Sequence, residues 1–256
     1  MIFDTHAHYD DEQFDIDREE LLGSMKEAGI GNIVNVGANM ASSESSLALA
    51  EKYDFIYAAV GVHPSDSEEL NEENIERLRK MSSHEKCVAI GEIGLDYYWP
   101  EPDHEIQKKW FKRQLQLARE VKKPVIIHSR EAAQDTLSIM REENAGQIGG
   151  VVHCFSYSRE VARECADMGF YIGIGGVLTF KNGRKLKEVA EALPMEKILL
   201  ETDCPYLAPV PYRGKRNCSL YLPLVVEALS EIKGISPEEV IEITEKNARE
   251  MYGLSR

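Results

Sequence analysis

The sequence predicts an α/β fold, a (β/α)8 TIM barrel that spans residues 1–256 as a single domain. Short apolar runs rich in Val and Ile alternate with amphipathic helical segments, and there are eight such runs. Several runs are continuously apolar, which is typical of parallel strands buried on both faces. Eight strand–helix units in about 250 residues match this barrel. An open, doubly wound sheet gives the same alternation and is the alternative fold.

The eight apolar runs are the expected strands. They are Met1–Thr5, Asn32–Val36, Ile56–Gly61, Cys87–Gly91, Pro124–His128, Val151–Cys154, Phe170–Ile174 and Lys197–Glu201. Helical patterning predicts helices over residues 18–28, 42–52, 72–81, 104–121, 131–143, 159–168, 184–193 and 220–232. Asn71 is expected to cap the third helix. Ser236 and Pro237 open a capping box, which predicts a last helix to about Tyr252, with Gly253 as its stop.

The composition limits the class of protein. The 256 residues include 30 Lys and Arg against 44 Asp and Glu, a net charge of −14, and 43% are hydrophobic. This fraction supports a core and excludes global disorder. No window approaches the ~20 apolar residues of a membrane span, and the N-terminus lacks a signal-peptide pattern. Five cysteines without a Cys-x-x-Cys pair argue against a disulfide framework. We expect a cytoplasmic protein without a membrane partner, and the charge argues against generic adhesion to nucleic acid.

Five of the seven histidines fall at or just after the end of an expected strand. They are His6, His8, His63, His128 and His153. Residues two apart on a strand face the same way, so His6 and His8 can reach one cation. The alternatives are polar residues at a strand end and, for the later histidines, hydrogen-bonded core residues. In a barrel, however, all these strand ends open onto one rim.

Two carboxylates complete the candidate site. Glu92 and Asp203 each close an apolar run, where a buried acid needs a partner charge. A salt bridge for Glu92 and a helix cap for Asp203 are the alternatives. Four histidines and two carboxylates on one rim are enough for two divalent ions, with one carboxylate shared. Imidazole with carboxylate suits Zn, Mn, Fe or Co, whereas Mg prefers more oxygen, so the residues leave the metal open.

Basic residues cluster near the same rim. Arg130 follows the fifth strand, and Arg213 and Arg216 lie in a short segment after the eighth. The arginine fork matches phosphate oxygens, although a short basic run is more often a solvated loop. Three aromatic residues after the fourth strand could stack on a nucleobase or simply pack. They are Tyr97, Tyr98 and Trp99.

Seven motifs, in this order and over nearly the whole chain, resemble those of the TatD family of metal-dependent hydrolases, often described as TatD DNases. They are Asp4-Thr5-His6-Ala7-His8, Gly61-Val62-His63-Pro64, Gly91-Glu92-Ile93-Gly94-Leu95-Asp96-Tyr97-Tyr98, His128-Ser129-Arg130, His153-Cys154-Phe155-Ser156, Glu201-Thr202-Asp203-Cys204-Pro205 and Arg213-Gly214-Lys215-Arg216-Asn217. The resemblance implies an amidohydrolase-like barrel and a metal-dependent deoxyribonuclease with 3′→5′ exonuclease action. Two departures from the family pattern, Tyr157 and Cys218-Ser219, lie near the expected substrate rim and leave substrate preference open.

The resemblance also distributes the predicted ligands between two metal ions. The first ion would be held by His6, His8 and Asp203. The second would be held by His128 and His153.

Glu92 would bridge the two ions, and His63 would lie near substrate or water. We therefore expect hydrolysis of a DNA phosphodiester by a water that the two metal ions activate, with Asp203 as ligand and proton acceptor. Arg130 and the 213–216 segment would orient the phosphate. A monomer that engages DNA transiently, at single strands or strand ends, fits the negative charge of the chain.

Two other functions stay open. The fold and the His-x-His pair also serve an amidohydrolase for a cyclic amide, a lactone or a deaminase substrate. The end of the fourth strand offers Glu92 and no lysine, which argues weakly against carbamylated-lysine subtypes. A closed apolar pocket would favour this function, whereas phosphate bound beside Arg130 would favour the nuclease. A non-catalytic binding protein is the third function, and loss of a ligand would support it; none is lost here.

Overall fold

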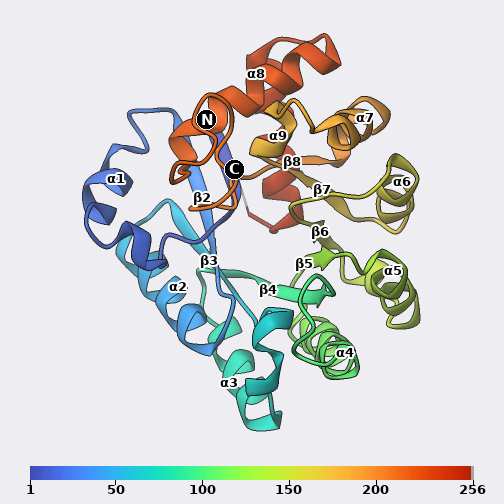
Figure 1. Cartoon of the computed structure of the whole chain (residues 1–256). Helices are drawn as coiled ribbons and strands as arrows, with labels where there is room; N and C mark the ends of the chain where they lie inside the picture. The colour runs from blue at the N-terminus through green and yellow to red at the C-terminus, as the bar shows by residue number, and fades with distance from the viewer. Residues whose placement is uncertain (255–256) are drawn as a thin grey trace.

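A parallel β-barrel forms the centre of the molecule (Figure 1). The computed structural model describes residues 1–254, and within them eight parallel strands pair in chain order. They are β1 (Ile2–Ala7), β2 (Ile30–Val36), β3 (Ile56–Val60), β4 (Cys87–Asp96), β5 (Val125–Arg130), β6 (Gly150–Val152), β7 (Tyr171–Ile174) and β8 (Ile198–Leu200). This order confirms the predicted barrel, because a doubly wound sheet would place its first strand in the middle.

Backbone hydrogen bonds close the barrel between β8 and β1. The Asp203 N–H donates to the His6 carbonyl at 2.9 Å, and the His8 N–H donates to the Cys204 carbonyl at 2.9 Å. Ala7 and Cys204 form a parallel bridge at the same place. The segment that carries Asp203 is therefore itself part of the seam of the barrel.

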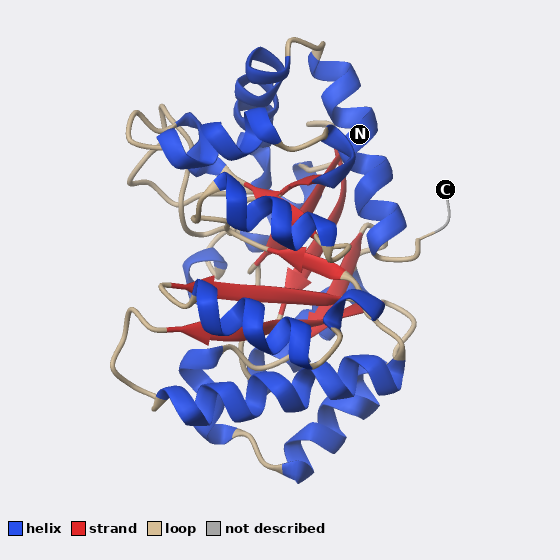
Figure 2. Cartoon of the chain, turned by 90° about the vertical axis from the view of Figure 1, so that its right-hand side faces the viewer, coloured by secondary structure: helices blue, strands red, loops and turns tan. Residues whose placement is uncertain are grey.

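Helices surround the strands, and Figure 2 shows them around the outside of the barrel. The α-helices within residues 1–254 are α1 (Arg18–Ser24), α2 (Met40–Lys52), α3 (Glu72–Ser82), α4 (His104–Val121), α5 (Ala133–Glu142), α6 (Arg159–Asp167), α7 (Arg184–Ala192), α8 (Leu222–Lys233) and α9 (Pro237–Met251). After α9, the Tyr252 hydroxyl donates to the Thr5 carbonyl of β1 at 2.8 Å. The Asn247 side chain of α9 donates to the Ile198 carbonyl of β8 at 2.9 Å. The last helix thus spans the two strands of the seam. Within residues 1–254, no α-helix is long and apolar enough to cross a membrane.

Local sequence signals set several of the element ends. The Asn71 side chain accepts from the Asn74 N–H at 2.9 Å, and the Ser236 hydroxyl accepts from the Glu239 N–H at 3.2 Å. These bonds confirm both predicted N-caps. They fix the start of α3 and of α9.

Strand β4 is longer than predicted. It was expected to end at Gly91, yet it pairs with β5 as far as Asp96. Gly94 lies opposite His128, and a Cβ at Gly94 would lie 1.9 Å from the His128 carbonyl oxygen, so only glycine lets the strands approach here. Glu92 therefore lies inside β4 rather than after it, in a strand whose residues are all buried.

Candidate metal centre

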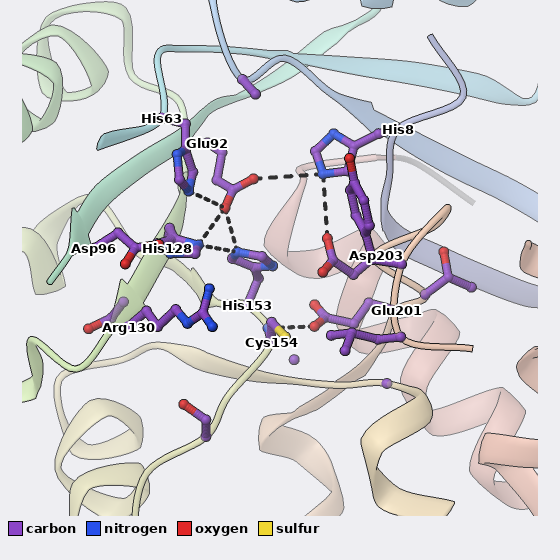
Figure 3. A pocket seen from close by; sticks show the side chains of 18 of the residues that line it. His8, His63, Glu92, Asp96, His128, Arg130, His153, Cys154, Glu201 and Asp203 are labelled. Atoms are coloured by element: carbon purple, nitrogen blue, oxygen red, sulfur yellow. Dashed lines mark hydrogen bonds and ion pairs between the residues drawn. The ribbon is translucent and has the colours of Figure 1, made fainter. Parts of the chain in front are cut away.

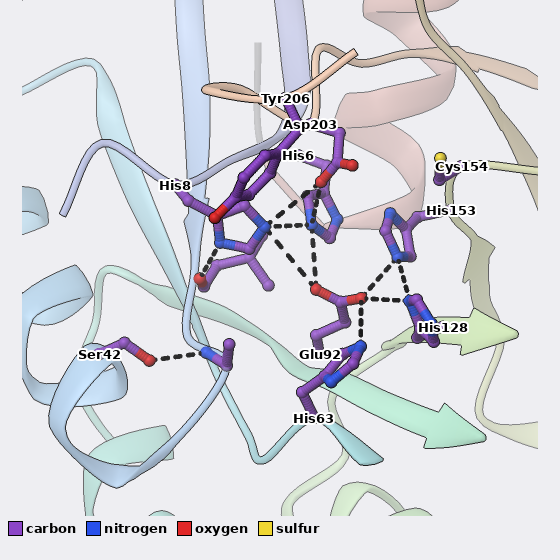
Figure 4. A network of polar contacts seen from close by, with 12 residues as sticks. His6, His8, Ser42, His63, Glu92, His128, His153, Cys154, Asp203 and Tyr206 are labelled. Carbon is purple, nitrogen blue, oxygen red and sulfur yellow. Dashed lines mark hydrogen bonds and ion pairs between the residues drawn. The ribbon is translucent and has the colours of Figure 1, made fainter. Parts of the chain in front are cut away.

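The six predicted ligand side chains meet at the carboxyl end of the barrel, around the Glu92 carboxylate (Figure 4). They come from β1 and the residue after it, from β4 and β5, from the residue after β6, and from the segment after β8. Parallel strands bring their carboxyl ends to one face, so residues far apart in the sequence become neighbours. His63, which follows β3, joins them, because its Nε2 lies 3.7 Å from Glu92 Oε1.

One set of donors, the β1 group, consists of His6, His8 and Asp203. The two Nε2 atoms of the histidines are 3.0 Å apart. Asp203 Oδ1 lies 3.7 Å from the first and 3.4 Å from the second. The His8 Nδ1–H donates to the Val36 carbonyl at 2.8 Å, because a carbonyl oxygen can only accept. In the neutral ring, Nε2 therefore carries the lone pair that a cation can use.

A second set, the β5 group, consists of His63, His128 and His153. His128 Nδ1 and His153 Nε2 are 3.2 Å apart. They lie 2.8 and 2.6 Å from the Oε1 atom of Glu92. His63 was predicted to be near substrate or water, and its Nε2 approaches the same oxygen. Three imidazoles therefore surround one carboxylate oxygen.

Glu92 divides its two oxygens between the two groups. Its Oε2 lies 3.3 Å from His6 Nε2 and 3.8 Å from His8 Nε2, whereas Oε1 faces the β5 group. Burial alone would raise the pKa of Glu92, but the surrounding histidines, His153 foremost, hold it well below its usual range. An ionised carboxylate between two sets of imidazole nitrogens matches the donor chemistry of a bridged pair of divalent ions.

The histidines of the site have strongly shifted pKa values. Burial opposes the charged form of His8, but Asp203 and Glu92 outweigh it and raise the pKa to about 9. For His128, Asp96 and Glu92 likewise outweigh burial and raise the pKa to about 9. Burial and the charge of His153 lower the pKa of His6 to about 4. Without a cation, protons balance part of the acidic charge, and a bound cation would replace them.

Asp96 is a member of the site that the sequence did not single out. Its Oδ2 lies 3.2 Å from His128 Nε2, and its Oδ1 accepts from the Tyr98 N–H at 2.9 Å. Because His128 Nδ1 faces Glu92, Asp96 orients the ring from its other edge. The available signal was an acid at a strand end, the same signal that identified Asp203.

Glu201 is the second residue that sequence reasoning missed. It is 1% exposed, and burial raises its pKa to about 8. Its Oε1 accepts from the Cys154 N–H at 2.5 Å (Figure 3). The residue belongs to the Glu201-Thr202-Asp203 motif. Its position at the end of an apolar run does not reveal which side chains its carboxylate contacts.

Apart from His6, which is fully buried, the donors form the floor of a pocket of about 940 Å³. Arg130 and Trp99 line its wall on the β4–β5 side, and Tyr206 and Leu207 line it on the β8 side. The Arg130 guanidinium lies 3.8 Å from the centre of the Tyr98 ring. The large apolar residues exposed around this mouth are Tyr98, Trp99, Tyr206, Leu207 and Val210.

The predicted basic segment does not face this pocket. Arg213 lies over the Phe180 ring, 4.4 Å from its centre. Arg216 donates to both carboxylate oxygens of Asp17, at 2.7 and 2.5 Å, and to the Gln13 carbonyl at 2.7 Å. Among the described residues that line the pocket, neither arginine appears.

Tyr97 differs from the two aromatic residues that follow it. Its ring stacks on His104 at 3.7 Å between centroids, and its hydroxyl donates to Asp135 at 2.7 Å. Tyr97 therefore packs against the helices, whereas Tyr98 and Trp99 are 48% and 54% exposed.

The two departures from the family pattern do not themselves line the pocket. The Tyr157 hydroxyl shares a hydrogen bond with Ser129 at 2.9 Å. Cys218 is buried, and the Ser219 hydroxyl donates to Asp4 at 2.6 Å. All three are absent from the described residues that line the pocket, although Tyr157 lies directly behind them, because Ser129 and Ser156 are lining residues.

A (β/α)8 barrel with this donor set at its carboxyl end has the architecture of a metal-dependent hydrolase. The chain matches the family described as TatD related DNase over residues 3–253, and it therefore belongs to the TatD family of metal-dependent hydrolases. A more distant solved structure, described as an uncharacterized amidohydrolase from Saccharomyces cerevisiae, superposes with a TM-score of 0.84 at 19% identity and shows that the two chains share the fold.

Three relatives show how closely the chain resembles known members. It is 46% identical over 255 residues to the uncharacterized metal-dependent hydrolase YabD of Bacillus subtilis, covering 100% of both chains. It is 32% identical over 259 residues to a Citrobacter rodentium protein named 3′-5′ ssDNA/RNA exonuclease TatD, covering 99% of this chain and 98% of that one. The crystal structure of YjjV, a TatD homologue from Escherichia coli K12, superposes with a TM-score of 0.93 at 32% identity, covering 99% and 98%.

Proposed function

We propose that this protein is a metal-dependent deoxyribonuclease that removes nucleotides from DNA in the 3′→5′ direction. The observation that carries the proposal is the division of Glu92 between two donor groups at the floor of an open pocket. The name of the Citrobacter rodentium relative, an exonuclease on single-stranded DNA and RNA, supports the same substrate class.

Two divalent ions would bind at this floor. The β1 group, His6, His8 and Asp203, would hold the first, and the β5 group would hold the second through His128 and His153, with His63 as a further donor. Glu92 would bridge them. When bound, the ions supply an activated water and polarise the phosphoryl group. The donor set admits Zn, Mn, Co or Fe and also Mg, and metal analysis decides among them.

Asp203 is the proton acceptor in this proposal. Burial would raise its pKa, but His8 and the neighbouring imidazoles hold the pKa below its usual range, so the carboxylate stays ionised at neutral pH. Its side chain is 17% exposed, against 5% for Glu92. Asp203 can therefore take a proton from the attacking water and pass it to solvent, whereas the more deeply buried Glu92 serves to bridge.

The wall of the pocket suits a nucleic acid end. The described contacts of Arg130 include no carboxylate partner, so its guanidinium is available to a phosphate group beside the floor. Trp99 and Tyr206 present exposed rings on opposite sides of the mouth, where unpaired bases can stack. Transient binding of single strands or strand ends fits a chain whose net charge is −14.

Digestion of DNA labelled at one end tests the proposal. The purified protein is loaded with Mg, Mn, Co or Zn, and single-stranded and double-stranded substrates are incubated with it. We expect progressive shortening from the 3′ end that stops when a chelator is added. Glu92→Gln should abolish the products, whereas Glu196→Gln, an exposed site with the same change of charge, should cleave normally. Absence of cleavage with all four metals, together with hydrolysis of cyclic amides or lactones, would reject the nuclease.

A further inference from the structure

Three neighbouring residues beside the metal centre each carry a buried polar atom without a hydrogen-bond partner. Within residues 1–254 five such side-chain atoms occur, and three of them are His6 Nδ1, His153 Nδ1 and Glu201 Oε2. One ring nitrogen of each histidine and one oxygen of Glu201 lie within 4.8 Å of one another. Buried polar groups without partners are costly, so their gathering indicates that these groups act together.

The imidazole rings of His6 and His153 lie parallel to each other. Their rings stack with centroids 3.9 Å apart and planes inclined by 8°. His6 Nε2 and His153 Nε2 both approach Glu92, at 3.3 and 2.6 Å. The Nδ1 atoms are therefore left for another partner. Histidines that ligate a metal usually donate this second N–H to a carboxylate or carbonyl, which fixes the tautomer and the direction of the ring.

The backbone holds the Glu201 carboxylate in place. Its Oε1 accepts from the N–H of Cys154, the residue that directly follows His153. On another side Gly173 leaves the necessary space, because a Cβ at that position would lie 2.1 Å from Oε2. One oxygen is thus anchored to the backbone, and the other is left for the imidazoles.

We propose that Glu201 is a positioning residue that accepts Nδ1–H hydrogen bonds from His6 and His153, directly or through one ordered water. It thereby holds both Nε2 lone pairs toward the cations. The proposal rests on the two-cation site proposed above. Since His6 belongs to the β1 group and His153 to the β5 group, one carboxylate sets the geometry of both groups.

Metal affinity is the readout that tests this role. Glu201→Gln keeps the shape of the side chain but replaces one acceptor oxygen with an amide nitrogen that can only donate, and the exposed Glu196→Gln is the matched control. Binding of Zn²⁺ and Mn²⁺ is measured by competition with a chelator, and stoichiometry by elemental analysis. We expect Glu201→Gln to weaken binding of both ions about 10–100-fold. The metal-free variant and the control should keep the circular dichroism spectrum of the wild type. Unchanged affinity, or weakening of one ion alone, would overturn the proposal.

A second variant separates the position of the carboxyl group from its acceptor chemistry. Gly173→Ala displaces the carboxyl group without altering its atoms, so it should weaken binding of both ions as Glu201→Gln does. Gly23→Ala is its control, because no atom lies within 4 Å of a Cβ there. In the zinc-loaded wild type, nitrogen-15 NMR should show His6 and His153 as Nδ1–H tautomers, and Glu201→Gln should shift these signals. Signals that do not move would overturn the proposal.

The two proposals can fail separately. A wild-type protein that binds two ions but leaves DNA intact contradicts only the nuclease. Wild-type affinity in both Glu201→Gln and Gly173→Ala contradicts only the role of Glu201. A wild-type protein that binds no divalent ion contradicts both.

Discussion

The floor and the rim of the pocket are built in different ways. The floor, formed by the β1 group, the β5 group and Glu92, lies on barrel strands or within three residues of a strand end, and each of its side chains is at most 17% exposed. The rim, formed by Trp99, Arg130, Tyr206 and Leu207, lies largely on loops, and all four side chains are exposed. Strand geometry leaves the floor little freedom, whereas each rim residue adopts the position that its own partners allow. The floor is therefore suited to chemistry and the rim to recognition.

The largest expected effect lies at the centre of the floor. Glu92→Gln removes the charge that both donor groups share, so both ions should be lost and DNA cleavage should fall by at least ~10³-fold. Cleavage rates with saturating Mn²⁺, together with elemental analysis, measure the change. If this variant kept two ions and more than a tenth of the wild-type rate, the central role of Glu92 in the floor would be contradicted.

Asp203→Asn should cause the next largest effect. The amide still offers an oxygen donor, but it cannot accept a proton at neutral pH. We expect kcat to fall about 10²–10⁴-fold with a smaller change in KM. Steady-state kinetics on a labelled single strand provide the numbers. Equal losses in kcat and in metal content would instead make Asp203 only a ligand.

The rim should respond more weakly, and two arginines make a matched pair. Arg130→Ala removes a cation beside the floor and should raise KM for DNA about 10-fold, the loss of roughly one charged hydrogen bond. Arg216→Ala removes the same charge from the loop that Asp17 holds, and KM should stay within about 2-fold. Reversal of this order would show that loop 213–216 moves onto the substrate.

The smallest expected effect concerns the stability of the fold, through the ion pair between Arg216 and Asp17. The hydrogen bonds from Arg216 hold the pKa of Asp17 below its usual range. Because the pKa is lowered in the folded state, this contribution is present above pH ~4 and is lost as the pH falls through the folded value. Arg216→Ala should cost about 1 kcal/mol at pH 7 and less at pH 3. Urea unfolding at the two pH values tests this, and a constant difference would contradict it.

The same contrast explains what the sequence could predict. The floor was predicted because a histidine or acid at the end of an apolar run has one destination in a barrel, the carboxyl rim. His6, Glu92 and His153 therefore meet although β1, β4 and β6 are distant in the chain. The barrel itself could be predicted from the eight alternating units. The extension of β4 could not, because it depends on the close approach of β4 to β5 at Gly94, and no local sequence pattern indicates this approach.

The positions of Arg216 and Tyr97 escaped prediction because they depend on partners distant in the sequence. Arg216 is drawn to Asp17, 199 residues earlier, and Tyr97 is held by Asp135. Neither pairing leaves a trace in the spacing of nearby residues. Asp96 and Glu201 were missed for a related reason. Their function lies in the far edges of histidine rings, and ring orientation is a tertiary property.

The seam of the barrel has a consequence for the order in which the protein matures. The β5 group and Glu92 are complete once residue 153 has been synthesised, but the β1 group needs Asp203, which follows β8. The backbone groups of His6 and Asp203 also form one of the hydrogen bonds that close the barrel. An ion held there would link two segments that most of the chain separates, and a crosslink over such a long loop restricts the unfolded state most. During synthesis the β1 group therefore cannot form before the barrel has closed.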